Sequence, residues 1–214
     1  FRDRLLTSTD RLGKLATIPI VVQTVNWANK TPATRSLMEK ALGVAKEAAL
    51  PPYAAKPFRK GFEKSLAWPV KNGERTPGKV AIFSTCYVNY NEPGIGRDLT
   101  KILGHNEIPF TIAAAEACCG MPKLELGDLE QVEKLKDINM PQLAALAREG
   151  YAIVTPVPSC TLMFKQELPL IFPEDADVKA VAEAMFDPFE YLVLRDKDGL
   201  LTKDFKQPLG KVSY

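Results

Sequence analysis

Residues 108–122 read Ile-Pro-Phe-Thr-Ile-Ala-Ala-Ala-Glu-Ala-Cys-Cys-Gly-Met-Pro. The short apolar run from 108 to 113 leads into the adjacent cysteines Cys118 and Cys119. A continuous apolar run of this length is typical of a strand that is covered on both faces of a sheet. Gly120 then lets the backbone turn without a Cβ atom. The stretch therefore predicts a buried strand that ends at a pair of thiols.

Two further apolar runs also lead to a cysteine. Residues 80–83, Val-Ala-Ile-Phe, come shortly before Cys86, and residues 151–155, Tyr-Ala-Ile-Val-Thr, come shortly before Cys160. Segments with helical spacing of apolar residues separate the runs and follow the third one. Pro141 is expected to kink or restart the helix before the third run, and a later helix is expected around residues 178–186. Asp187-Pro188, with Glu190 three residues after Asp187, has the pattern of a capped helix start. This alternation predicts an α/β domain over residues 79–214, with a parallel sheet and right-handed crossover helices.

The cysteines are placed where such a sheet binds ligands. Sheets of this class hold ligands beyond the carboxyl ends of their strands, and these ends meet at one edge. Because every cysteine of the chain follows a predicted strand end, we expect the sulfur atoms to converge in one pocket. The predicted cofactor-binding and metal-binding residues are Cys86, Cys118, Cys119 and Cys160.

Several chemistries suit four such thiols. Thiolates prefer soft metals, either zinc or the iron of an iron–sulfur cluster. Adjacent cysteines point in different directions and rarely both reach one zinc ion, whereas a cluster offers several irons, which favours the cluster. Inert buried thiols and a redox-active vicinal pair are the alternatives. Glu116 and Glu125 flank the pair and are either ligands, partners of ligands, or surface carboxylates.

Two segments precede the α/β domain. Residues 1–50 read as a helical extension, in which Thr31-Pro32 has the pattern of a helix start. Residues 51–78 contain five prolines and read as a Pro-rich connector. Trp27 in the first segment and Trp68 in the second are expected to be buried anchors. The composition, 46% hydrophobic and 25% charged over 214 residues, is that of a globular protein. Because the chain starts with Phe1 and residues 211–214 resemble the start of a strand, we expect a piece of a longer protein.

Charge is unevenly distributed along the chain. Residues 1–75 hold 14 Lys and Arg against 6 Asp and Glu, whereas residues 76–214 hold 14 against 20. The basic first third predicts an acidic partner or peripheral binding to an anionic membrane, with a solvated lysine-rich face as the alternative. Residues 18–22, the longest apolar run near the start, are far shorter than a membrane span of about 20 residues. With no signal-peptide pattern and no nucleic-acid motif, we expect a cytoplasmic protein, peripheral on the inner face of the membrane.

The cysteine spacing resembles a known family. Thirty-one residues separate Cys86 from Cys118-Cys119-Gly120, and forty residues separate Cys119 from Cys160, which lies within Pro-Ser-Cys-Thr-Leu. This pattern resembles the cysteine-rich CCG domain, the family of the B subunit of heterodisulfide reductase and the C subunit of anaerobic glycerol-3-phosphate dehydrogenase. The resemblance implies that the four cysteines bind an iron–sulfur cluster, of the [4Fe-4S] type, in an electron-transfer subunit that works with a dehydrogenase or another redox partner. It also implies a second CCG domain after this one and a ferredoxin-like segment before it.

One position departs from the family pattern. The family often ends its motif with Cys-x-x-Cys, and the earlier of these positions is Val157 here. This leaves the cluster type open and keeps zinc as an alternative. An exposed cluster is also readily lost in air. Two other functions stay open at this point: a zinc-stabilised or metal-free scaffold that docks partners, and a thiol–disulfide oxidoreductase that uses Cys118 and Cys119.

Overall fold

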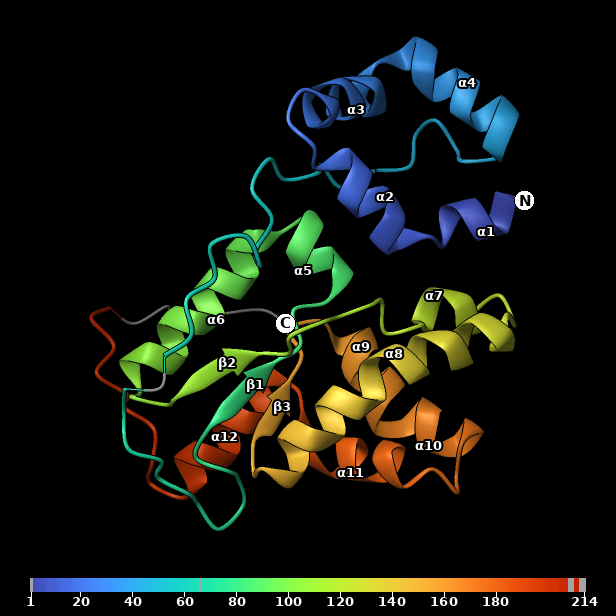
Figure 1. The fold of residues 1–214 in the computed structure, drawn as a ribbon. Coiled ribbons are helices and arrows are strands. Elements are labelled where there is room, and N and C mark those ends of the chain that lie inside the picture. Colours follow the sequence, from blue (N-terminus) through green and yellow to red (C-terminus); the bar gives the residue numbers. More distant parts are fainter. Residues whose placement is uncertain (1, 66, 208–209, 212–214) are drawn as a thin grey trace.

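The computed structural model of the chain describes residues 2–65, 67–207 and 210–211. Its centre is a four-stranded sheet in which all neighbouring strands are parallel, in the order β2-β1-β3-β4 (Figure 1). The strands are β1 (Val80–Ile82), β2 (Phe110–Ile112), β3 (Ala152–Val154) and β4 (Met185–Phe186). The predicted α/β class with a parallel sheet is confirmed.

Helices connect and cover the strands. Between β1 and β2 lie α5 (Cys86–Tyr90) and α6 (Pro93–His105), and between β2 and β3 lie α7 (Met121–Leu124) and α8 (Leu129–Arg148). The segment from β3 to β4 contains α9 (Pro158–Leu162), the π-helical turn η1 (Met163–Glu167), α10 (Leu168–Ile171) and α11 (Ala176–Ala184). After β4 comes α12 (Pro188–Lys197), which begins with a complete capping box from Asp187 and Glu190.

The sheet is buried on both faces, as the apolar runs predict. On one face Phe83, Ile153 and Phe164 belong to a core that includes side chains of α8, η1 and α11. On the other face Val80 and Leu103 belong to a second core, with side chains of α6 and α12. Continuous apolar strands can be accommodated only in such a three-layer arrangement, because neither face meets water.

Two elements differ from the prediction. The sequence predicts that Pro141 kinks or restarts a helix, and α8 does not restart there, because it is a single helix of 20 residues with Pro141 inside it. Val132, Met140 and Leu143 pack into the first core, and this burial offsets the hydrogen bond that proline removes. The sequence also predicts helix through Phe186, whereas the last two residues of that segment form β4 beside β3.

The first part of the chain folds into four helices. They are α1 (Arg2–Leu6), α2 (Thr9–Ala16), α3 (Val21–Lys30) and α4 (Pro32–Leu42), and they lie together above the cysteine-bearing edge of the sheet (Figure 1). Thr31 and Pro32 begin α4 as predicted. Trp27, expected as a buried anchor, is 62% exposed on α3, whereas Trp68 is half-buried and packs against the second core.

The segment between α4 and β1 runs along the domain and is fixed to it by backbone contacts. Ala54 and Phe58 donate backbone hydrogen bonds to the carbonyl oxygens of Tyr90 and Asn89, at 2.7 and 3.0 Å. Ser65 pairs with Phe110 of β2 in an antiparallel bridge. The predicted strand start at 211–214 falls mostly on residues 212–214, which lie outside the described residues.

Candidate functional site

Three loops at the carboxyl edge of the sheet carry the cysteines. Cys86 is the first residue of α5, four residues after β1 ends, and Cys118 and Cys119 precede α7, which follows β2. Cys160 lies in α9, after β3. Since the three strands are parallel neighbours, their carboxyl ends deliver these loops to the same place, as the sequence predicts.

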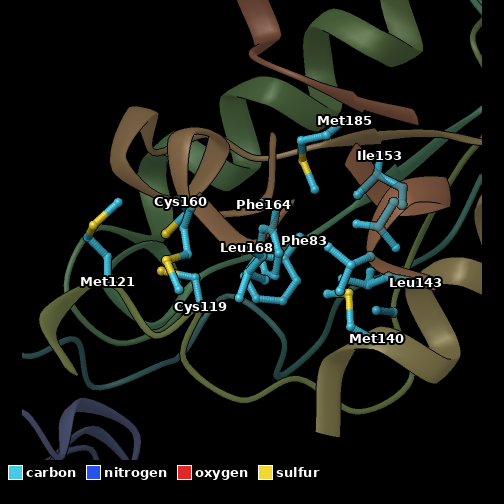
Figure 2. Close-up of a cluster of buried hydrophobic side chains, with 14 of the residues drawn as sticks. Phe83, Cys119, Met121, Met140, Leu143, Ile153, Cys160, Phe164, Leu168 and Met185 are labelled. Atoms are coloured by element: carbon cyan, nitrogen blue, oxygen red, sulfur yellow. The ribbon is translucent and has the colours of Figure 1, made fainter. Parts of the chain in front are cut away.

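The structure brings all four predicted cysteines to one cavity of about 630 Å³. The thiols of Cys86 and Cys119 lie within hydrogen-bonding reach of the Cys118 sulfur, and that of Cys160 reaches Cys119. Figure 2 shows the side chains of Cys119 and Cys160 pointing toward one another. All four cysteines are free thiols, and all except the half-buried Cys86 are buried.

Charge is distributed unequally among these sulfur atoms. Hydrogen bonds donated first by the Cys119 thiol and then by the Cys86 thiol hold the pKa of Cys118 well below its usual range. The same contacts with Cys118, followed by burial, raise the pKa of Cys86, and the pKa of Cys119 is raised by its hydrogen bonds to Cys118 and Cys160. These directions favour a negative charge on Cys118 over one on Cys86 or Cys119.

The backbone around the cysteines is constrained. Thr85, directly before Cys86, has φ +62° and ψ 156°, a region that β-branched residues rarely occupy. Its side chain accepts a hydrogen bond from the Val88 amide and so begins α5. Gly120, directly after Cys119, has φ +102°, and a Cβ there would lie 3.3 Å from Met163 Cε. The predicted need for glycine beside the thiol pair is borne out by this geometry.

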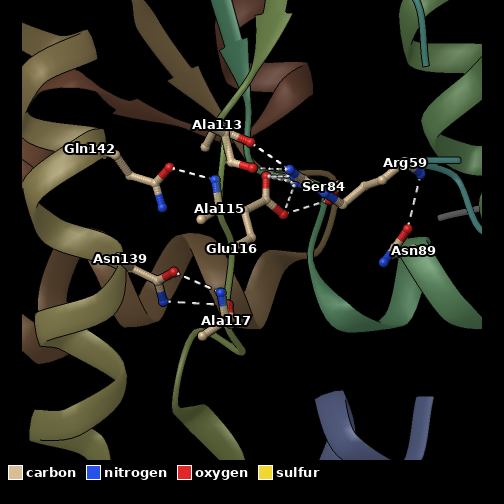
Figure 3. Close-up of polar contacts among 10 residues, drawn as sticks. Arg59, Ser84, Asn89, Ala113, Ala115, Glu116, Ala117, Asn139 and Gln142 are labelled. Carbon is tan, nitrogen blue, oxygen red and sulfur yellow. Dashed lines mark hydrogen bonds and ion pairs between the residues drawn. The ribbon is translucent and has the colours of Figure 1, made fainter. Parts of the chain in front are cut away.

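A buried ion pair joins two of the cysteine loops (Figure 3). Glu116, two residues before Cys118, accepts hydrogen bonds from the Ser84 amide at 3.0 Å and contacts Arg59 at 2.8 Å. The guanidinium of Arg59 also donates to the carbonyl oxygens of Ala113 and Ala114, at 2.6 and 3.0 Å. Burial raises the pKa of Glu116, while Arg59 and Ser84 act in the opposite direction.

The structure therefore gives Glu116 and Glu125 different environments, which the sequence left open. The Glu116 side chain is only 6% exposed, so the interpretation as a surface carboxylate is wrong for it. Its carboxylate contacts Ser84 and Arg59 and so holds the loops that carry the cysteines. Glu125 is exposed and contributes to the wall of the cysteine cavity.

Helix α8 holds the same loop from the other side. The side chain of Asn139, fully buried, accepts a hydrogen bond from the Ala117 amide at 3.0 Å and donates to the Cys118 carbonyl at 3.1 Å. Gln142 accepts from the Ala115 amide at 2.9 Å. The loop before the cysteine pair is thus fixed by the connector and by α8 together (Figure 3).

The N-terminal helices contribute to the site, which the sequence did not indicate. The carboxylate of Asp10, on α2, accepts a hydrogen bond from the Cys118 amide, and burial raises its pKa. Lys123, on α7, donates to Thr7 Oγ1 at 2.6 Å. No local pattern could reveal these contacts, because more than 100 residues separate the partners.

Comparison with known proteins identifies the cysteine-bearing part. Residues 80–165, which include all four cysteines and the three strands that deliver them, match the family model of the CCG cysteine-rich domain. This part of the chain is a CCG domain. No solved structure matches the chain significantly.

Similarity to curated proteins extends beyond the CCG domain. The chain is 28% identical to the C subunit of anaerobic glycerol-3-phosphate dehydrogenase of Escherichia coli (strain K12) over 177 residues, 81% of this chain and 43% of that protein. It is 29% identical over 111 residues to the B subunit of fumarate reductase (CoM/CoB) of Methanothermobacter marburgensis, covering 51% of this chain and 20% of that protein. Lactate utilization protein A of Macrococcus caseolyticus is 30% identical over 109 residues, 51% of this chain and 42% of that protein.

These comparisons relate the chain distantly to oxidoreductase subunits. The chain spans less than half the length of each of these three relatives. The position where the family pattern often has a further cysteine is Val157, which precedes α9 and lines the cavity together with the four cysteines.

Proposed function

We propose that the chain is an iron–sulfur electron-transfer part of an oxidoreductase. The observation that carries the proposal is that four thiols from three strand ends line a single cavity. Thiolates are the ligands of iron–sulfur clusters, so the donor set fits the group. The ligands would be Cys86, Cys118, Cys119 and Cys160, and a bound cluster would supply one-electron transfer.

The adjacent pair of cysteines favours a cluster over a single zinc ion, because neighbouring cysteines point in different directions and rarely both reach one ion. A cluster spreads its ligand positions over several atoms, which suits the adjacent pair of cysteines. The cluster type, [4Fe-4S] in our proposal, rests on the family alone.

The residues around the thiols have defined tasks in this proposal. Glu116 and Asn139 fix the loop of the cysteine pair, so that little reorganisation accompanies a change of charge. Met121 and Met163 belong to the apolar core beside the pair and keep water away from it. A dry surrounding and hydrogen bonds to sulfur are the means by which a protein sets the reduction potential of such a centre.

The test is chemical analysis of anaerobically purified natural protein. We expect iron and acid-labile sulfide in comparable amounts, and their loss in a Cys119→Ser variant. A folded sample that contains neither, even after anaerobic reconstitution with iron and sulfide, would refute the proposal. One zinc per chain without visible absorption would instead support a zinc-stabilised scaffold.

A second function is favoured by the adjacent thiols, which line an accessible cavity together with Cys86 and Cys160. The lowered pKa of Cys118, caused by hydrogen bonds from Cys119 and then Cys86, adds support, because thiol–disulfide exchange begins with a thiolate. Forming a disulfide between Cys118 and Cys119 would release two electrons and two protons to an external disulfide. Mass spectrometry of rapidly alkylated, metal-free protein would reveal a reversible disulfide if this function is correct.

We further propose that helices α1–α4 bring the chain to a partner protein or to an anionic membrane surface. Large apolar side chains, among them Leu15, Ile20 and Trp27, are 60–77% exposed on or beside α2 and α3, close to basic residues such as Arg11 and Lys14. None of the helices in the described part is long and apolar enough to cross a membrane. Sedimentation with anionic and with neutral vesicles, at low and high salt, would separate membrane binding from docking to a protein.

A further inference from the structure

The cysteine cavity has two walls of different chemistry. One wall consists of the four cysteines and their neighbours at the carboxyl edge of the sheet. The other wall comes from helices α1–α4 and the segment that follows α4, which lie above this edge (Figure 1). Its apolar side chains include Leu5, Leu12, Val25, Met38, Leu42 and Val44. A cluster bonded to the cysteines needs only the first wall, so the cluster alone does not account for the second.

The second wall is not the edge of a closed core within the N-terminal helices. Of the residues that the structure describes, none from α1–α4 belongs to either hydrophobic core of the α/β domain. The buried residues of these four helices are Gly13, Ala16, Val22 and Arg35. Leu12, Val25 and Leu42 are only half-buried, because they face the cavity. The helices therefore present apolar surface to the same space that the cysteines line.

The charge of the lining restricts the kind of ligand. Among the described residues, those that line the cavity include no lysine, arginine or histidine, and their one carboxylate, Glu125, is exposed. A phosphate or carboxylate group would lose water there without gaining a cation, which is costly. The side chains of Asn29 and Tyr53 offer neutral hydrogen-bonding groups instead. The lining thus favours an uncharged molecule that is mostly apolar and carries few polar atoms.

The size of the cavity suits a small molecule and not a partner protein. Its volume of about 630 Å³ lies within the range of about 300–1,000 Å³ that small-molecule sites have. A protein partner would cover about 800 Å² of surface on an open face. This cavity is instead bounded on one side by α1–α4 and on the other by the cysteine loops. Its form therefore suits a small molecule that lies between these two parts of the chain.

We infer that the cavity binds an uncharged, mostly apolar small molecule between helices α1–α4 and the cysteines. The inference deepens the proposed function, because it names the class of molecule that the redox site takes, and it rests on that function for the redox role of the ligand. The binding itself rests only on the volume and the lining of the cavity. Helices α1–α4 then form half of a ligand site, besides any contact with a partner protein or a membrane.

The first experiment compares two ligands of nearly the same shape: naphthalene carboxamide, which is uncharged, and naphthalene carboxylate, which is an anion at neutral pH. Equilibrium dialysis against anaerobically purified natural protein measures both dissociation constants. We expect the amide to bind more tightly by about tenfold or more, because the lining offers the carboxylate no cation. Equal binding of the two ligands would overturn the inference. Binding of neither, which is expected if another part of the natural protein fills the cavity, would also overturn it.

The second experiment changes the apolar wall. Leu42, on α4, lines the cavity, whereas Leu37, on the same helix, is 65% exposed. Leu42→Arg should weaken binding of the amide and tighten binding of the carboxylate, each by about tenfold, and the matched control Leu37→Arg should change neither. Val25→Phe fills part of the cavity from α3 without adding charge, so it should weaken binding of the amide, and its control is Val21→Phe on the exposed side of α3. Urea unfolding verifies that each variant folds.

Iron is measured in the same samples, so that this inference and the proposed function fail separately. If the samples contain no iron, even after anaerobic reconstitution, but still prefer the amide to the carboxylate, the proposed function fails and the ligand site stands. If Leu42→Arg and Val25→Phe bind the amide as the natural protein does, the ligand site is wrong, whatever the iron content. The same conclusion follows if Leu37→Arg changes the binding as much as Leu42→Arg.

Discussion

Glu116 connects the loop of Cys86 with the loop of Cys118 through its bonds to Ser84 and Arg59. Replacing one partner of a buried ion pair leaves the other charge without compensation. Breaking a fully buried ion pair usually costs about 3–5 kcal/mol. Because the Arg59 side chain is 22% exposed, we expect a smaller effect: Glu116→Gln should lower the free energy of unfolding by about 2–4 kcal/mol. Urea unfolding of the metal-free protein measures this change.

The control for this prediction is Glu130→Gln. Glu130 pairs with Lys134 on the exposed side of α8, where an ion pair is screened by water. We expect no measurable change in the unfolding midpoint of this variant. Equal midpoints for both variants would mean that the buried pair between Glu116 and Arg59 does not hold the two loops together.

A single substitution at Val157 tests whether the cysteine that the family often has at this position would bind the cluster. Its side chain lines the cavity, and the Cys160 amide donates to its carbonyl oxygen at 2.9 Å. Val157→Cys therefore adds a fifth thiol to the cavity. We expect the variant to retain more iron per chain after anaerobic reconstitution and to show an altered electron paramagnetic resonance spectrum. Unchanged iron content and spectrum would show that position 157 does not reach the cluster.

At the scale of elements, α8 is the support of the cysteine pair. Asn139→Ala removes three hydrogen bonds to the loop and leaves the half-buried Ala117 amide without its acceptor. We expect a loss of about 2–3 kcal/mol in the free energy of unfolding, together with lower retention of iron. Gln142→Ala, which removes one bond to the exposed Ala115, should cost less than half as much. If Gln142→Ala cost more stability than Asn139→Ala, the main support of the loop would lie at Ala115 instead.

The sequence predicts the elements that local patterns encode. Strands β1, β2 and β3 follow from their continuous apolar runs, and the capping box of α12 from Asp187 and Glu190. Strand β4 is not predicted, because its two residues continue the helical pattern of the segment before them. They form a strand only because they pair with β3. The uninterrupted α8 escapes prediction because burial against the sheet, which is a tertiary effect, outweighs the local effect of Pro141.

The same distinction applies to the site. The meeting of the four cysteines follows from sheet topology, which an alternating pattern of strands and helices fixes. The roles of Arg59 and Asn139 do not follow from it, since each acts on residues far away in the chain. The basic composition of the first third predicts a surface that binds an acidic partner or an anionic membrane. It does not reveal that α2 lies over the thiols.

At the scale of the whole molecule, the end of the α/β domain is fastened to the connector before it. Tyr191, on α12, donates a hydrogen bond to the Pro77 carbonyl at 2.8 Å, and Arg195 donates to the Lys71 carbonyl at 2.7 Å. Asp198 contacts Arg75 on the same side. These contacts join residues more than 110 positions apart, so we expect the connector and the α/β domain to unfold together.

Tyr191 allows this connection to be tested by pH. Burial raises its pKa to about 12, whereas an unfolded tyrosine ionises near pH 10. The unfolded state therefore loses its proton first, and the stability that Tyr191 contributes is complete below pH 10 and falls as the pH rises toward 12. Below pH 10 we expect Tyr191→Phe to cost about 1 kcal/mol, for the lost hydrogen bond to Pro77.

Between pH 10 and 12 this difference should change by about 2–3 kcal/mol in total, because phenylalanine does not ionise, so that the Tyr191→Phe variant becomes the more stable protein by about 1–2 kcal/mol. Urea unfolding of both proteins at several pH values, with Tyr87→Phe on the exposed side of α5 as a control, measures the change. A difference that stays constant up to pH 12 would mean that Tyr191 is accessible to solvent in the folded protein. The contact between α12 and the connector would then not be part of the cooperative fold that supports the cysteine edge.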